Sequence, residues 1–215
     1  MLWVSYVFGG SSMLDGVIKY SIEHQRQDTP LFSGYEQLEA LRTRLFTLGL
    51  IGEKDGIGYG NLSIRDDKSK SFFITATQTG RKHLLSPEYY TYISDYDFTT
   101  FKVISQGTHK PSSEALSHAM IYAIDERIKA VIHIHSLALW QFMKDRNDLS
   151  TTAEYGTVQM VKEIAGLYTN LDPMNNNAFV MKGHEEGIIT FGTSVEEAEL
   201  ILYNIMQAYL QEDLK

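Results

Sequence analysis

The chain has 215 residues, of which 43% are hydrophobic and 21% are charged, and this size and composition suit one globular domain with an apolar core. Its formal net charge of −8 at pH 7 argues against a nucleic-acid partner, because a nucleic-acid-binding protein needs a basic face. The sequence has no cysteine, which excludes disulfides and thiolate chemistry, so any metal ligands must come from histidines and carboxylates.

The start of the chain, from Met1 to Met13, is mostly apolar and aromatic. It lacks the cationic start and the cleavage site of a signal peptide, and it is too short to span a bilayer as a helix. We expect residues 1–33 to form an N-terminal extension and residues 34–215 to form a single domain. We also expect a cytoplasmic protein with no membrane partner.

Hydrophobic periodicity predicts one helix and four strands in the first half of the chain. Leucines at helical spacing, followed by Gly49 where a C-cap glycine belongs, predict a helix from Gly34 to Leu48. Four glycines between Gly52 and Gly60 predict a loop. Short β-prone runs predict four strands, of which the first two form a hairpin around the polar turn Asp66–Lys70: Leu62–Arg65, Phe72–Thr77, Tyr89–Ser94 and Thr99–Ser105.

The second half is predicted to add two helices and three strands. One helix begins at Pro111-Ser112-Ser113-Glu114 and runs to about Ile124, with Ser112 or Ser113 as its N-cap and Glu114 in its first turn. An amphipathic helix closes the chain from Ser194 to Leu210. The predicted strands, of which the last two pair, are Ala130–Ile134, Ala178–Lys182 and Gly187–Phe191. Together these elements indicate one α/β domain in which helices cover an antiparallel-rich central sheet.

The sharpest local signal for chemistry is the run Val131-Ile132-His133-Ile134-His135. Residues two apart in a strand point to the same face, so His133 and His135 would project together while the isoleucines face the core. Two imidazoles on a stiff support suit a divalent metal site. The pair alone is equally consistent with two hydrogen-bonded histidines near a strand end.

A third histidine favours the metal interpretation. His184 follows the apolar run Ala178–Met181 and stands among glycines, where a side chain can point into a cleft. Three histidines with an open position are the usual ligands of a catalytic zinc site. By itself, His184 would be read as an ordinary turn histidine.

Glu114 is the candidate acid/base. A carboxylate beside a divalent cation can ligate it at rest and move protons during turnover. Without the histidines, Glu114 would be read as a solvated acid stabilised by the helix dipole. His118 lies one helical turn further on the same face, and we favour a packing or supporting role for it over that of a fourth ligand.

Small polar groups could bind a phosphate without a basic surface. Ser112 and Ser113 lie at a predicted helix N-terminus, where free N–H groups and the dipole attract anions. Asn61 and Thr79-Gly80 are further small polar groups in loops. Each is ordinary turn chemistry when taken alone.

Five short motifs together resemble the class II aldolase/adducin family: Gly60-Asn61-Leu62-Ser63, Thr79-Gly80, Pro111-Ser112-Ser113-Glu114, His133-Ile134-His135-Ser136 and Gly183-His184. The resemblance runs from about Gly34 to Leu210. It implies a three-layer α/β/α sandwich with a mostly antiparallel central sheet, and assembly as a homotetramer.

The resemblance also implies roles for individual residues. It matches His133, His135 and His184 to the ligands of a Zn²⁺ ion, although three imidazoles also accept Mn²⁺, Fe²⁺ or Co²⁺. It matches Glu114 to the acid/base that touches the resting metal. The residues matched to the pocket for the phosphate of a small-molecule sugar phosphate are Asn61, Thr79, Gly80, Ser112 and Ser113.

Two positions depart from the pattern of the family's aldolases. Those enzymes carry a catalytic tyrosine between the second and third metal histidines, whereas the corresponding stretch here, Gln141–Thr152, has none. Tyr155-Gly156-Thr157 is similar to the aromatic-Gly-Thr that follows that stretch. Glu185 stands after His184 where many members have glycine, which bears on the local backbone.

As a hypothesis, the resemblance implies a metal-dependent aldehyde-lyase of the class II aldolase type. It would act on a short ketose phosphate through an enediolate intermediate. Alternatives on the same scaffold are a sugar-phosphate 4-epimerase and a methylthioribulose-1-phosphate dehydratase. A non-catalytic adducin-like binding module is a further alternative, against which the three histidines and Glu114 argue.

Overall fold

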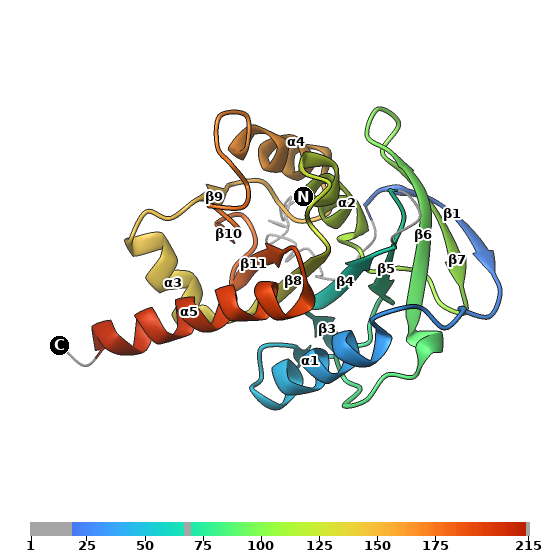
Figure 1. The fold of residues 1–215 in the computed structure, drawn as a ribbon, viewed down its shortest axis with the longest axis horizontal. Helices are drawn as coiled ribbons and strands as arrows, with labels where there is room; N and C mark the ends of the chain where they lie inside the picture. Colours follow the sequence, from blue (N-terminus) through green and yellow to red (C-terminus); the bar gives the residue numbers. More distant parts are fainter. Residues whose placement is uncertain (1–18, 67–69, 214–215) are drawn as a thin grey trace, which may run out of the picture.

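The computed structural model describes residues 19–66 and 70–213, and within these ranges a nine-stranded sheet has helices on both faces (Figure 1). The strand order is β1-β7-β6-β5-β4-β8-β11-β10-β9. The outermost pairs, β1 with β7 and β10 with β9, are parallel, and the other pairs are antiparallel. The predicted three-layer α/β/α sandwich with a mostly antiparallel sheet is therefore confirmed.

The strands of this sheet are β1 (Ser21–Arg26), β4 (Asn61–Arg65), β5 (Phe72–Thr75), β6 (Tyr90–Asp97), β7 (Lys102–Gly107), β8 (Ala130–His135), β9 (Ser150–Thr151), β10 (Ala178–Met181) and β11 (Gly187–Gly192). The predicted β4–β5 hairpin is confirmed by their antiparallel register, and so is the pairing of β10 with β11. The middle of the predicted turn between β4 and β5, residues 67–69, lies outside the described residues.

Helices form a layer on each face of the sheet (Figure 1). One layer contains α1 (Tyr35–Thr47), α3 (Leu137–Asp145) and α5 (Val195–Asp213), and the other contains α2 (Ala115–Ile124) and α4 (Val158–Leu167). A short 3₁₀ turn, Pro87–Tyr89, precedes β6. None of the helices within the described ranges is long and apolar enough to cross a membrane.

Strand β8 lies in the middle of the sheet and contributes to two apolar cores. Val131 packs with residues of α2 and α4, whereas Ile132 and Ile134 pack with residues of α1, α3 and α5. Successive side chains of a strand point to opposite faces, so His133 and His135 lie on the face of Val131. The alternation thus places both histidines on the side covered by α2 and α4.

The predicted first helix is confirmed as α1, whose leucines Leu38, Leu41 and Leu45 are fully buried. Its ends need glycine, because Gly34 and Gly49 both adopt left-handed backbone (φ 83° and 71°), which glycine tolerates without a steric penalty. The predicted loop Gly52–Gly60 is wrong in part, since it contains a hairpin of β2 (Gly52–Lys54) and β3 (Ile57–Tyr59). Positive φ at Asp55 and Gly56 (53° and 81°) gives the tight turn that this hairpin requires.

The predicted start of helix α2 is also corrected. The helix begins at Ala115 with Glu114 as its N-cap residue, so neither Ser112 nor Ser113 is the N-cap and Glu114 is not in the first turn. Tertiary hydrogen bonds fix the preceding turn instead: the Ser112 N–H donates to the Thr75 carbonyl (3.1 Å) and the Tyr20 hydroxyl donates to the Ser112 carbonyl (2.7 Å).

Part of the expected N-terminal extension joins the sheet. Strand β1 pairs in parallel with β7 at one edge. The boundary at residue 34 stays a prediction, and the apolar start of the chain from Met1 to Met13 lies outside the described residues. The sequence carried no prediction for β1, α3, α4, β9 or the 3₁₀ turn before β6.

Arg42 ties the loop after β5 to helix α1. Its guanidinium is buried and donates hydrogen bonds to the backbone carbonyls of Thr79 (3.1 Å), Lys82 and His83 (2.9 Å). Burial lowers the pKa of Arg42 from its ordinary value, and the nearby Glu39 opposes that shift. A planar fork of donors serves these carbonyls together, which an ammonium group cannot do. The loop therefore has a fixed position relative to α1.

Replacing Arg42 by lysine should lower the free energy of unfolding by about 2–3 kcal/mol, because buried carbonyls would lose their donors. Urea denaturation with an unchanged m-value measures this loss. The matched control is Arg44→Lys on the same helix, where the side chain is 48% exposed and pairs with Glu199, and the expected loss is below about 1 kcal/mol. Equal losses of unfolding free energy in the two variants would show that the buried hydrogen bonds of Arg42 stabilise the fold no more than the exposed pair of Arg44 does.

Candidate metal centre and active site

His133 and His135 occupy the end of β8, where both neighbouring strands hold them. Asn61 of β4 lies opposite His133, and Gly187 of β11 lies opposite His135. The two histidines are buried, with 1% and 8% of their surface exposed. Because β8 is paired along both edges, the two imidazoles stand on a rigid support, as the sequence pattern predicts.

His184 reaches the same place from the turn between β10 and β11. Its Nε2 lies 3.0 Å from the Nε2 of His135, and the three histidine rings have centroids 4.7–5.4 Å apart. One nitrogen from each ring lies within 4.8 Å of the others. Bonds of about 2.0–2.1 Å to a tetrahedral metal would hold two nitrogens roughly 3.3 Å apart. The spacing of this group therefore fits a metal ion.

Gly187 makes this convergence sterically feasible. A Cβ at this position would lie 2.8 Å from the His184 Cδ2 and 3.2 Å from the His133 Nε2. The first distance is shorter than real Cβ contacts allow, so a side chain here would push the rings apart. A glycine opposite His135 is thus a condition for the three imidazoles to meet.

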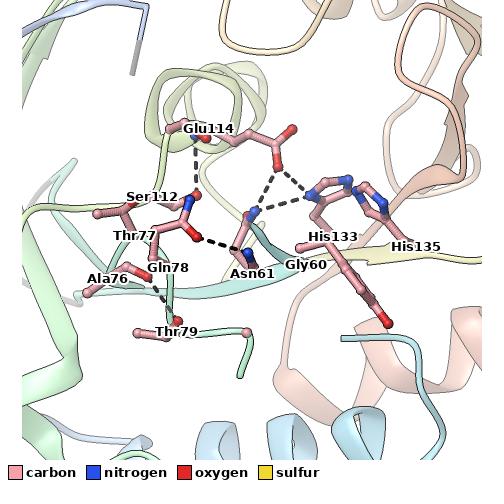
Figure 2. A pocket seen from close by; sticks show the side chains of 14 residues that line it. Gly60, Asn61, Ala76, Thr77, Gln78, Thr79, Ser112, Glu114, His133 and His135 are labelled. Carbon is pink, nitrogen blue, oxygen red and sulfur yellow. Dashed lines mark hydrogen bonds and ion pairs between the residues drawn. The ribbon is translucent and has the colours of Figure 1, made fainter. Parts of the chain in front are cut away.

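Glu114 lies beside the histidines at the start of α2 (Figure 2). Its Oε2 forms an ion pair with the His133 Nδ1 and accepts a hydrogen bond of 2.7 Å from the Asn61 Nδ2. Within the described part of the chain, Glu114 Oε1 and His133 Nε2 are buried without a hydrogen-bond partner. Buried polar atoms are rarely left unpaired, so these two atoms suit contact with a cation or a substrate.

Two ionisable groups of the site have pKa values that their surroundings shift. Burial alone would raise the pKa of Glu114, but the attraction of His133 and His184 and the hydrogen bond from Asn61 outweigh it and hold the pKa well below its usual range. Burial, together with the other two histidines, lowers the pKa of His135 well below its ordinary value. An ionised carboxylate and a neutral imidazole are the forms that coordinate metals.

The residues matched to a phosphate pocket all lie in one pocket with Glu114, His133 and His135: Asn61, Thr79, Gly80, Ser112 and Ser113. Figure 2 shows Asn61, Thr79 and Ser112 around this pocket, with Glu114 next to Ser112 and its carboxylate beside His133. The sequence prediction therefore names residues that the fold brings together from three separate segments: the loop after β5, the turn before α2 and, contrary to the expected loop, the first residue of β4, Asn61. Their roles in binding stay predictions.

Several residues at or beside the site were not singled out from the sequence. Gln78 lines the pocket with left-handed backbone (φ 59°), and its Oε1 accepts a hydrogen bond of 2.9 Å from the Gly58 N–H. Tyr59 stacks on His135, with ring centroids 5.1 Å apart. Tyr59 precedes the motif Gly60-Asn61 and Gln78 precedes the motif Thr79-Gly80. This proximity was the only feature of the sequence that could have indicated them. Glu186, whose Oε2 lies 3.8 Å from the His135 Nδ1, was also missed.

His118 is separate from the three-histidine group. Its Nδ1 lies 2.7 Å from the Ser63 Oγ, which in turn lies 2.8 Å from the Tyr122 hydroxyl. Burial lowers the pKa of His118 to about 3, so the ring is neutral. Among the described residues His118 is thus not part of the possible metal-ligand group, and its role stays a prediction.

The stretch without a tyrosine, Gln141–Thr152, forms the end of α3 and the short strand β9. Tyr155, which follows it, is buried, and its ring centroid lies 4.8 Å from that of His184. The Lys19 ammonium lies 3.9 Å from the centroid of the Tyr155 ring. An aromatic side chain therefore adjoins the third histidine, although not at the position expected from the family's aldolases.

The fold and the site together define an α/β/α protein in which three buried histidines could hold a metal ion beside a polar pocket. A family profile described as "Class II Aldolase and Adducin N-terminal domain" matches residues 52–209. The chain belongs to this family, as its five motifs predict.

Solved structures of other proteins share this fold. The chain is 19% identical to YgbL, a putative aldolase/epimerase/decarboxylase from Klebsiella pneumoniae, with a TM-score of 0.58 over 82% of this chain and 86% of that chain. It is 16% identical to L-fuculose-1-phosphate aldolase from Thermus thermophilus, with a TM-score of 0.57 over 82% of this chain and 91% of that chain. A comparison with curated protein sequences gave no significant match. At these identities the likeness shows the fold alone.

Protein purified without chelators should contain one divalent ion per chain. His133→Ala or His184→Ala should remove nearly all of it, because the remaining protein ligands are too few for tight binding. Elemental analysis measures the metal content, and His24→Ala is the control, since that ring bonds to Ser105 at 2.9 Å instead. A full complement of metal in both variants would refute the ligand assignment.

Proposed function

We propose that the chain is a metal-dependent aldehyde-lyase of the class II aldolase type that acts on a short ketose phosphate through an enediolate intermediate. The observation that supports this most is the shared pocket, which joins Glu114 and two of the three histidines to the candidate phosphate-binding residues. Such a pocket would hold both ends of a short substrate: its carbonyl near the histidines and its phosphate near Ser112 and Thr79.

His133, His135 and His184 would hold the cation, for which we propose Zn²⁺, with Mn²⁺, Fe²⁺ and Co²⁺ as alternatives, since imidazole binds all four. When bound, a divalent cation supplies Lewis-acid chemistry that polarises a substrate carbonyl. The pairing of β8 with β4 and β11 holds the imidazoles of His133 and His135 in a fixed orientation.

Glu114 would move the proton. Its Oε2 is occupied by Asn61 and His133, whereas its Oε1 has no partner among the described residues. We assign proton uptake to Oε1, which can take the proton released when the C–C bond is broken and return it to the product. Burial of this carboxylate excludes water from the transfer and strengthens its interactions.

The phosphate would be positioned by small donors and backbone. Ser112 and Ser113 precede α2, a ten-residue helix, whose N-terminal dipole favours an anion. The backbone at Gly80 packs tightly against the backbone at Gly52. A Cβ on Gly80 would lie only 1.9 Å from the Gly52 carbonyl oxygen, so glycine is required there. An anion could therefore bind here despite the net charge of −8.

A second candidate is an epimerase or dehydratase on the same scaffold, including a sugar-phosphate 4-epimerase and methylthioribulose-1-phosphate dehydratase. The specific observation is the altered stretch before Tyr155, which has no tyrosine between Gln141 and Thr152. A screen of ketose 1-phosphates and pentulose 5-phosphates with product analysis distinguishes these reactions. Assembly as a homotetramer and a cytoplasmic location stay predictions.

Phosphorylated ligands should stabilise the fold. Inorganic phosphate or phosphoglycolohydroxamate at a hundred times its dissociation constant should add roughly 2.7 kcal/mol to the free energy of unfolding, visible as a higher melting temperature. The double variant Ser112→Ala/Ser113→Ala should lose this shift, whereas Ser94→Ala, on β6 and outside the pocket, should keep it. No shift with any phosphorylated ligand would argue against a sugar phosphate.

Glu114→Gln should separate catalysis from metal binding. The amide keeps the size of the side chain but cannot take up the proton, so the rate should fall by about 10²–10⁴-fold. The assay is solvent-deuterium exchange at the carbon next to the carbonyl of dihydroxyacetone phosphate, or of the substrate found by the screen. The two proteins are compared at equal metal content, and equal exchange rates would remove Glu114 from the mechanism.

A further inference from the structure

The turn that carries His184 also carries an acidic residue in an unusual conformation. Glu186 has a φ of 71°, in the left-handed region that residues other than glycine rarely adopt and that costs about 1 kcal/mol or more. Its backbone carbonyl accepts a hydrogen bond of 2.9 Å from the Ser136 N–H, directly after His135. The turn is therefore fastened to the end of β8.

This conformation directs the Glu186 carboxylate toward His135. Oε2 lies 3.8 Å from the His135 Nδ1, and Oε1 accepts a hydrogen bond of 2.9 Å from the Lys54 ammonium. The Glu186 side chain is only 20% exposed, whereas the Lys54 side chain is 66% exposed. The carboxylate is thus held between a lysine at the surface and a buried histidine.

The tautomer of His135 gives this contact a function. The His135 Nε2 faces the His184 Nε2 at 3.0 Å, so Nε2 is the nitrogen directed at the candidate metal position. A neutral imidazole that coordinates through Nε2 must carry its proton on Nδ1. Metal-binding histidines nearly always donate that second N–H to an acceptor, which fixes the ring and raises its basicity.

We propose that Glu186 is a positioning residue for the metal centre, accepting the His135 Nδ1–H, with Lys54 holding its carboxylate in place. This inference rests on the proposed function, since it assumes that the three histidines bind a cation. A small rotation of the ring or the carboxylate brings the two atoms from 3.8 Å into hydrogen-bond range. Tyr59, stacked on the His135 ring, limits its tilt from another side.

The β2–β3 hairpin would then act on the metal through two contacts. It supplies both Lys54, which pairs with Glu186, and Tyr59, which stacks on His135. Neither side chain is a ligand, so their effect would be on the orientation of His135. The neighbouring acid, Glu185, is exposed, and no ion pair of Glu185 with His135 is found in the described part of the chain. Glu185 therefore provides a matched control of the same charge.

The test is a Co²⁺ titration of the metal-free full-length protein, followed by the visible absorption of the bound ion. Glu186→Ala should raise the dissociation constant roughly 10–100-fold, the usual effect of removing such a partner. Glu186→Gln, which keeps an acceptor without the charge, should fall between Glu186→Ala and the unaltered chain. Glu185→Ala should leave the dissociation constant unchanged.

A further variant separates orientation from folding. Glu186→Gly removes the same carboxylate but suits the left-handed backbone, so the metal-free variant should melt no lower than the unaltered chain while binding Co²⁺ as weakly as Glu186→Ala. Dissociation constants equal to that of the unaltered chain in both variants would overturn the role of Glu186 and leave the proposed function standing. If the unaltered chain binds no Co²⁺, both the inference and the proposed metal chemistry fail.

Discussion

Strand β8 pairs with β4 along one edge and with β11 along the other, which sets Asn61 opposite His133 and Gly187 opposite His135. A slip of one residue in either pairing would move the histidines to the opposite face of the sheet. The register is secured by Ile132 and Ile134, which alternate with the histidines and are buried in the apolar core under α1, α3 and α5. The packing of the hydrophobic core therefore also determines where the imidazoles lie, because burial of the isoleucines of β8 fixes the face to which the histidines point.

Charge at the site is balanced locally. A buried carboxylate would normally be neutralised by protonation, because burial disfavours the ionised form. Here Glu114 stays ionised because His133 and Asn61 both contact the same oxygen. The arrangement leaves its other oxygen without a hydrogen-bond partner among the described residues. If the site binds a cation and a phosphate as proposed, the cation would offset the negative charge of Glu114 near the phosphate. Metal and phosphate binding are thus expected to reinforce each other.

Several elements with a local sequence pattern were predicted, although α3 and α4 were not, even though the side chains of Ser136 and Thr157 cap them locally. The leucine spacing of α1 and the alternation of isoleucine and histidine in β8 were sufficient to predict these two elements. In both, the spacing of the apolar residues marks the side that packs on the core. The start of α2 was misplaced because the preceding turn is fixed by Tyr20 and Thr75 rather than by a serine cap. In the site, the motif residues were found by their chemistry. Gln78 and Glu186 were not, because positive backbone φ brings them into place and their side chains alone gave no signal.

The walls of the pocket meet at a contact made largely by backbone. A Cβ on Gly80 would collide with the Gly52 carbonyl oxygen and the Gly58 Cα, and a Cβ on Gly58 would approach the Gly80 nitrogen to 2.9 Å. Gly58 and Gly80 therefore tolerate a side chain poorly, even though neither residue has a side chain that could act on a substrate. Adaptation to a substrate of another size would instead be recorded in side chains such as Gln78, which line the same pocket without closing this contact. Differences in substrate specificity between this chain and its relatives should accordingly be looked for at the position of Gln78.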